Sequence, residues 1–201
     1  MRRFVALAVI VVAAAASAAV APPTVPSLAS LKEIRIGVQP ATGVSLGAVN
    51  LTFESSTFGD ASELGPAPVG HKGDASESVM WVCYTLPQEM QRLWLTSSEL
   101  GGRTYIDGLV AEVIPGGTPT PDDCPELPKR FRHIHMDHGV WLGTPIGALK
   151  RQFGQPTNIH NGTLEFTYSG KSGEYDVEST LIVRLIGNRV VALHASHSTT
   201  N

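Results

Sequence analysis

The stretch Gly139–Pro156, GVWLGTPIGALKRQFGQP, carries the clearest secondary-structure signals of the chain. Thr144-Pro145 is typical of a helix start, because threonine caps free backbone amides and proline fits the first helical position. Apolar side chains recur at helical spacing after it, at Leu142, Ile146, Leu149 and Phe153. Gly154 and Pro156 then favour a helix end. The stretch therefore predicts one short amphipathic helix.

Three strand patterns follow this helix. Leu164–Tyr168 alternates strictly between apolar and polar residues, as a half-buried strand does. Leu181–Ile186 and Val190–Ser196 are two further apolar-rich runs, and the Gly187-Asn188 pair between them is typical of a two-residue hairpin turn. Together they predict a three-stranded antiparallel meander after the helix.

The first half of the chain repeats this pattern more loosely. Its helix is expected over Thr57–Gly65, and its strands over Met80–Tyr84, Arg92–Thr96 and Tyr105–Ile114. Leu64-Gly65-Pro66-Ala67-Pro68 resembles Phe153-Gly154-Gln155-Pro156-Thr157, and Tyr84 corresponds to Tyr168 at the end of a first strand. Internal repetition is a strong indicator of architecture. We therefore predict an α+β fold of two αβββ units, each a short helix packed on a three-stranded antiparallel meander.

This interpretation divides the chain into five segments. They are a signal peptide (1–18), a flexible lead-in (19–31), a first αβββ-like unit (32–114), a linker with Cys124 (115–138) and a second αβββ unit (139–201). A further short strand is expected over Leu31–Val38.

The first 18 residues have the layout of a secretory leader. Arg2 and Arg3 precede the apolar run Phe4–Ala16, and Ala16-Ser17-Ala18 offers small residues for cleavage. The run is shorter than the roughly 20 apolar residues that span a bilayer. We expect a periplasmic or secreted protein without a transmembrane span after cleavage. The alternative, a leader kept as an anchor, stays open.

The charge balance disfavours polyanionic partners. The leader holds two of the 15 basic residues, so the remaining chain has 13 against 18 acidic residues, a net charge of −5. Nucleic acids and anionic lipids need clustered positive charge. We therefore expect no nucleic-acid partner, and another envelope or secreted protein is the partner that this compartment favours.

Two cysteines are present, Cys83 and Cys124. In an oxidising compartment an even number indicates a disulfide, and the spacing is not the C-x-x-C of redox pairs. If the repeat holds, Cys83 points away from the helix, because Val82 and Tyr84 point toward it and strand side chains alternate. The disulfide would then hold the linker across the open face of the first sheet.

The segment Gly139–Ser196 resembles a known group of proteins. Gly-x-x-Leu-Gly-Thr-Pro, a short helix, Phe-Gly-x-Pro and an aromatic-ending strand are similar to the αβββ units of SmpA/OmlA-type (BamE-like) outer-membrane assembly lipoproteins. Tandem αβββ units also resemble the β-lactamase inhibitor proteins. Both resemblances imply a protein-binding module without a cofactor. The chain lacks the lipidated cysteine of the lipoproteins, which leaves attachment to the outer membrane open.

A second resemblance points to chemistry. His133-Ile134-His135-Met136-Asp137-His138 reads H-x-H-x-D-H, the signature of the metallo-β-lactamase superfamily. By this resemblance His133, His135 and His138 would bind zinc and Asp137 a second metal ion. His160, Asp176 and His194 follow in the order of the family's later ligands. Zinc suits imidazole and carboxylate ligands and lowers the pKa of its bound water.

Three features of the chain oppose this second interpretation. The motif follows a charged, proline-bearing segment instead of an apolar strand, an aspartate–glycine turn in an early strand is missing, and only 63 residues follow His138. A low-affinity metal site is a further alternative, because H-x-H on a strand aims both rings to one side. Our main hypothesis is a non-enzymatic protein-binding module of unknown partner. A zinc-dependent hydrolase and a secreted enzyme inhibitor remain the alternatives.

Overall fold

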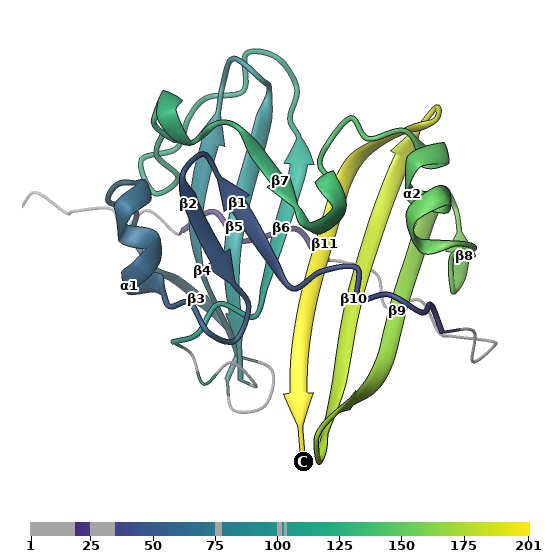
Figure 1. Ribbon diagram of the computed structural model, residues 1–201. Coiled ribbons are helices and arrows are strands. Elements are labelled where there is room, and N and C mark those ends of the chain that lie inside the picture. Colours follow the sequence, from purple (N-terminus) through teal and green to yellow (C-terminus); the bar gives the residue numbers. More distant parts are fainter. Residues whose placement is uncertain (1–18, 25–34, 75–77, 100–101, 103) are drawn as a thin grey trace, which may run out of the picture.

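The computed structural model describes residues 19–24, 35–74, 78–99, 102 and 104–201. It is α+β and rich in strands, with two antiparallel sheets and a few short helices (Figure 1). The larger sheet contains, in spatial order, β3 (Gly70–Lys72), β4 (Val79–Leu86), β5 (Gln91–Ser98), β6 (Gly108–Val113), β11 (Arg189–Thr200), β10 (Tyr175–Ile186), β9 (Thr163–Ser172) and β8 (Asn158–His160). The smaller sheet has the order β2 (Val49–Thr52), β1 (Gly43–Leu46), β7 (Ile134–Met136).

The helices are short. They are α1 (Phe58–Ala61), α2 (Ile146–Phe153) and 3₁₀ turns at Ser62–Leu64, Lys129–Phe131 and Asp137–Gly139. Both α-helices lie on the same side of the larger sheet as the smaller sheet (Figure 1).

Both predicted meanders are present, as β4–β5–β6 and β9–β10–β11. Five of these six strands run longer than the periodicity indicated, whereas β6 covers Gly108–Val113 instead of the expected Tyr105–Ile114. Ile106 leaves the ladder because its amide donates to the Ser56 carbonyl and its carbonyl accepts from the Glu54 amide. The start of this expected strand is therefore used to hold the loop that leads into α1.

The two meanders share one sheet. Strand β6 pairs with β11 in an antiparallel register that places Leu109 opposite Ala195. From this central pair the chain order of the strands descends outward on both sides, to β3 at one edge and β8 at the other. The segments 32–114 and 139–201, expected as two units, thus contribute to one continuous eight-stranded sheet.

The main core lies between one face of this sheet and the layer formed by the helices and the smaller sheet. Alternation along the strands sends one set of side chains to this layer. The largest fully buried members include Tyr84, Leu95, Leu109 and Phe166 from the larger sheet and Leu46 and Leu51 from the smaller one. Phe153 of α2 packs against Phe166, with ring centroids 5.5 Å apart.

The start of α1 follows the sequence and the start of α2 does not. Thr57 and Asp60 form a reciprocal capping box at α1. Thr144 was expected to cap α2, and this prediction is wrong. The helix begins at Ile146, and the Thr144 hydroxyl instead accepts a 3.0 Å hydrogen bond from the Trp141 amide. Thr144 therefore stabilises the turn before the helix rather than the helix end.

Glycines end both helical segments, as the sequence predicted. Gly65 and Gly154 have φ values of +113° and +81°, which β-carbon-bearing residues rarely adopt. The Gly65 carbonyl also accepts a 2.9 Å hydrogen bond from the Tyr84 hydroxyl. Burial raises the pKa of Tyr84 to about 12, so this phenol stays a donor at neutral pH. The first helical segment is thereby fixed to β4.

The smaller sheet was not expected from the sequence. Strand β7 lies inside the segment 115–138 that was interpreted as a linker, and it pairs with β1 about ninety residues earlier in the chain. The further strand expected over Leu31–Val38 is not formed at residues 35–38, and residues 31–34 lie outside the described part. Within the described residues, no helix combines the length and apolar character needed to cross a bilayer.

Candidate functional site

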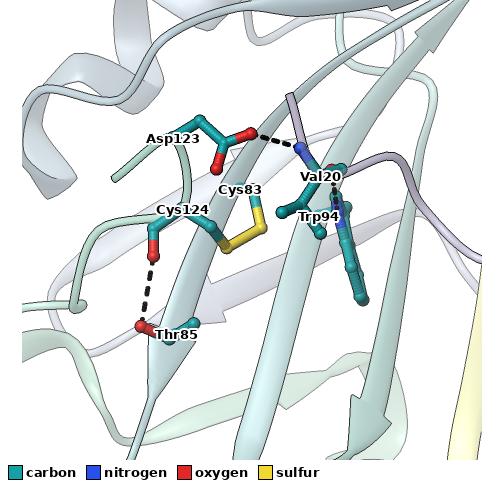
Figure 2. The surroundings of a disulfide bond; sticks show 6 residues. All are labelled: Val20, Cys83, Thr85, Trp94, Asp123 and Cys124. Carbon is teal, nitrogen blue, oxygen red and sulfur yellow. Dashed lines mark hydrogen bonds between the residues drawn. A yellow bond between two sulfur atoms is a disulfide. The ribbon is translucent and has the colours of Figure 1, made fainter. Parts of the chain in front are cut away.

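The disulfide Cys83–Cys124 is present, and it fixes the linker to the sheet face opposite the helices (Figure 2). Backbone hydrogen bonds extend this attachment, because the Thr85 amide donates to the Pro125 carbonyl and the Leu127 amide donates to the Thr85 carbonyl, each at 2.8 Å. The Thr85 hydroxyl also donates to the Cys124 carbonyl at 3.2 Å. The linker end therefore runs along β4 like a short additional strand.

A second, smaller apolar cluster surrounds the disulfide on this face. Its buried members are Trp81, Cys83, Trp94, Val110 and Cys124. They are separate from the main core because they point to the other side of β4, β5 and β6. The expectation that Cys83 points away from the helix is in agreement with this arrangement.

The segment Ala19–Thr24 lies against this second cluster. Ala19 and Val20 pack on it, and the Val20 carbonyl accepts a 2.9 Å hydrogen bond from the Trp94 indole nitrogen. On the other side of Val20, its amide donates to the Asp123 carboxylate (Figure 2). The residues expected to start a flexible lead-in thus cover Trp94, which is only 1% exposed.

Beyond Val20 the face is hollowed. A cavity of about 370 Å³ is lined by Pro23, Thr24, Val110, Glu112, Thr163, Ile182, Arg184, Ala192, Leu193 and His194. It combines a cation, an anion and an imidazole with apolar surface, at the place where β6, β11 and β10 lie side by side.

His194 is the perturbed titratable group of this face. Burial lowers its pKa to about 4, so the ring is neutral at physiological pH. Its Nδ1 is buried and has no hydrogen-bond partner among the described residues. A buried ring nitrogen without a partner is costly, which makes His194 a candidate contact for a bound group.

The H-x-H-x-D-H motif lies on the opposite side of the molecule from this face, on the outer surface of the smaller sheet. It borders an open groove of about 660 Å³ together with residues of β1 and β2. His133 and His135 lie on one side of β7, with ring centroids 5.6 Å apart. The alternation along β7 therefore brings these two imidazoles together, as the sequence indicated.

The other two members of the motif have structural contacts. Asp137 accepts hydrogen bonds from the Thr42 amide and hydroxyl, both at 2.6 Å. His138, at φ +60°, contacts the Gln152 side-chain amide at 2.9 Å and the Gln39 carbonyl at 3.3 Å. Their side chains tie the end of β7 to neighbouring segments.

The later residues of the lactamase-like order are spread over other elements. His160 is on the edge strand β8, where it contacts Asn161, Asp176 pairs with Lys171 at the start of β10, and His194 is on β11. In the part of the chain that the structure describes, no three His, Cys, Asp or Glu side chains form a group that could hold a metal ion. The fold brings His133 and His135 together and leaves His160, Asp176 and His194 apart from them.

Sequence reasoning missed Val20 and Asp123 as site residues, and it named His194 only as a residue of the lactamase-like order. The position of Trp94 directly opposite Cys83 follows from the hairpin register and could have indicated the second cluster. No sequence signal pointed to the contact between Val20 and Asp123, which are 103 residues apart. Comparison with protein-family models, with curated proteins and with solved structures finds no match for this chain.

Proposed function

We propose that the protein is an exported, non-enzymatic module that binds an extended segment of another envelope or secreted protein. The binding surface is the partly open sheet face of β10 and β11, next to the segment Ala19–Thr24. The leader-like first 18 residues and the disulfide support export, since disulfides persist in oxidising compartments.

The observation that carries this proposal is that the segment Ala19–Thr24 itself covers the neighbouring part of the same sheet face, over β4–β6. Val20 is held by Trp94 of β5, and Pro23 and Thr24 border the cavity with His194 of β11. A polypeptide segment therefore already lies on the face, using backbone hydrogen bonds and small side chains. The adjoining cavity is lined by both apolar and polar side chains, which suits the continuation of such a segment from a partner.

The tandem αβββ interpretation belongs to the same proposal. The chain order α1–β3–β4–β5–β6 is repeated as α2–β8–β9–β10–β11. Tyr84 pairs with Leu93, which pairs with Ala111 on the next strand. Tyr168 pairs with Ser179, which pairs with His197 on the next strand. The equal element order supports two repeated units that meet at β6 and β11.

Site-directed photo-crosslinking tests this function. A photoreactive amino acid is placed at Arg184, which is exposed and lines the cavity, and as a control at Ile159 on β8, which is 62% exposed. We expect one partner, identified by mass spectrometry after export in the native host, to crosslink through position 184 and not through position 159. Crosslinking through both positions, or through neither, would contradict a binding surface at the cavity.

The same crosslinking experiment distinguishes a protein-binding module from an enzyme inhibitor. A protease or a β-lactamase as the crosslinked partner, with loss of its activity in the complex, would identify the inhibitor alternative. A structural envelope protein would support the module.

The runner-up function is a zinc-dependent hydrolase, which the proximity of His133 and His135 in an open groove favours. Under this alternative residues of the His133–His138 cluster would hold zinc, which would lower the pKa of its bound water and supply a hydroxide nucleophile. The test is zinc content of purified protein and its melting shift with added zinc, with His133→Ala as the variant and His160→Ala on β8 as the matched control. Stoichiometric zinc that only His133→Ala removes, together with turnover of esters or lactams, would overturn the non-enzymatic proposal.

A further inference from the structure

Asp123 is placed by the disulfide at a fixed point beside β4 and β5. It directly precedes Cys124, whose sulfur is bonded to Cys83 and whose carbonyl accepts from Thr85. Its neighbour Asp122 is exposed, whereas Asp123 is half-buried and its carboxylate accepts the Val20 amide. The two adjacent carboxylates therefore differ in environment, and only Asp123 is aimed at the N-terminal segment.

Val20 is held on both sides. Asp123 takes its amide, and the Trp94 indole donates to its carbonyl at 2.9 Å. Because both backbone groups are bonded, the register of the segment is fixed, and the nitrogen of Ala19 lies one residue away, within about 3.6 Å of chain. Ala19 itself packs on the cluster around the disulfide.

We propose that Asp123 and Trp94 form a binding site for the mature N-terminus, which cleavage after Ala18 creates. Water adds across the Ala18–Ala19 bond, which leaves a carboxylate on Ala18 and an ammonium group on Ala19. The new cation then lies beside the Asp123 carboxylate. The inference rests on the exported state of the proposed function and adds to it a coupling between leader removal and closure of the sheet face.

The charge change is what makes the site specific for the cleaved chain. An amide nitrogen in an uncut chain offers one neutral N–H, whereas an ammonium group offers three donors and a positive charge. Charge-assisted hydrogen bonds are roughly twice as strong as neutral ones. Pro22 and Pro23 restrict the segment before it docks, so less conformational entropy is lost on binding.

The site is also conditional on oxidation. Without the Cys83–Cys124 bond, the part of the linker next to Asp123 loses its covalent attachment to β4 and depends on hydrogen bonds to Thr85 and the packing of Leu127. Docking of the N-terminus therefore requires a chain that is both processed and oxidised. In this protein both conditions are met only after export.

Purified protein that begins at Ala19, released from a fusion by a protease that leaves no extra residue, tests the proposal. It is compared with the same chain extended by Gly-Ser, with Asp123→Asn, and with the control Asp122→Asn. The readouts are the melting temperature and the rate at which an aminopeptidase removes Ala19, followed by mass spectrometry.

We expect the extension and Asp123→Asn each to lower the melting temperature by about 4 °C, which corresponds to a tenfold change, or about 1.4 kcal/mol, for a chain of this size. Asp123→Asn also speeds removal of Ala19 roughly tenfold. The two changes together do no more than either alone, because both remove one interaction. Asp122→Asn changes neither readout.

Additive effects of the extension and Asp123→Asn, or a trimming rate of Asp123→Asn equal to that of the unmodified chain, would overturn the proposal. The extension leaves every residue of the mature chain unchanged, so its result stands even if Asp123→Asn disturbs the linker. No partner is needed in these measurements. A failure of N-terminal docking is therefore distinguishable from a failure of partner capture at Arg184.

Discussion

The two halves of the eight-stranded sheet have the same strand plan and different open faces. When Tyr84 is aligned with Tyr168, a row of three paired residues across β4–β6 corresponds to a row of three across β9–β11. The first row is Cys83, Trp94 and Val110, and the second is Thr167, Thr180 and Ser196.

The first row is apolar, and all of it is buried beneath the linker and the N-terminal segment. In the second row Thr180 and Ser196 are half-buried. The same arrangement of strands is therefore compatible with a face covered by another segment and with a partly open face. The polarity of the side chains on that face decides which one forms. Apolar surface gains free energy when another segment covers it, and hydroxyl-bearing surface does not.

Truncating one residue in each row is the strongest test of this comparison. Trp94→Ala is expected to cost about 3–5 kcal/mol of the free energy of unfolding, because it empties a fully buried site and removes the donor to Val20. Thr180→Ala should change it by less than about 0.5 kcal/mol. Urea unfolding followed by circular dichroism measures both values. Equal costs would mean that the two faces are equally packed.

Removal of the disulfide is expected to have the next largest effect. Cys83→Ala with Cys124→Ala opens a loop whose ends are 41 residues apart, which the chain-entropy model places at about 3–4 kcal/mol. Thr167→Ala at the corresponding position of β9 is the control and should cost far less. A loss of under 1 kcal/mol in the double variant, measured by the same urea titration, would show that the hydrogen bonds to Thr85 hold the linker unaided.

The lowered pKa of His194 predicts that the free energy of unfolding decreases in acid. Its folded pKa is about 4 and its unfolded pKa is about 6.5, so the unfolded chain binds more protons between these values. Stability is therefore fully present above pH 6.5 and falls toward pH 4, by on the order of 3 kcal/mol. Glu112 and Arg184 border one cavity at this ring, and Asp107 and His197 border another.

Because these other polar groups surround the ring, the measurement is the difference between the wild type and His194→Gln across pH 4–7. That difference should grow as the pH rises, since only the wild type gains stability from the neutral imidazole. A difference that is constant with pH would contradict a buried, neutral His194.

The smallest effect is expected at the two aligned tyrosines. Tyr84→Phe removes the 2.9 Å hydrogen bond to the Gly65 carbonyl and should cost about 1 kcal/mol. Tyr168→Phe, at the half-buried counterpart, should cost less. Thermal unfolding of the two variants side by side is sufficient. The reverse order would mean that the two helical segments are attached to the sheet in a different way from that described.

Local patterns in the sequence were enough to predict the meanders, the helix-ending glycines and the disulfide. Alternation along Val82–Tyr84 also gave the side on which Cys83 lies, because a strand has only two faces. These features depend on neighbouring residues or on a single pairing of two cysteines. For the same reason, the pairing of His133 with His135 followed from strand alternation alone.

Features that depend on distant contacts were not predictable in this way. The joining of β6 to β11 is an edge pairing that no residue of either strand encodes by itself. Strand β7 has three residues, too few for a periodic signal, and the position of Val20 is determined by Trp94 and Asp123 far along the chain. Thr144 was misassigned because the Trp141 turn competes for its hydroxyl.

The outermost strands of the larger sheet, β3 and β8, have only three residues each, and they carry exposed His71, Lys72 and His160. Long, flat edge strands invite strand addition from neighbouring molecules, whereas short edge strands with charged or polar side chains discourage it. Edges of this kind disfavour stacking of the protein into fibres. The two meanders join through the central pair β6–β11, which leaves only short edge strands at the ends of the larger sheet.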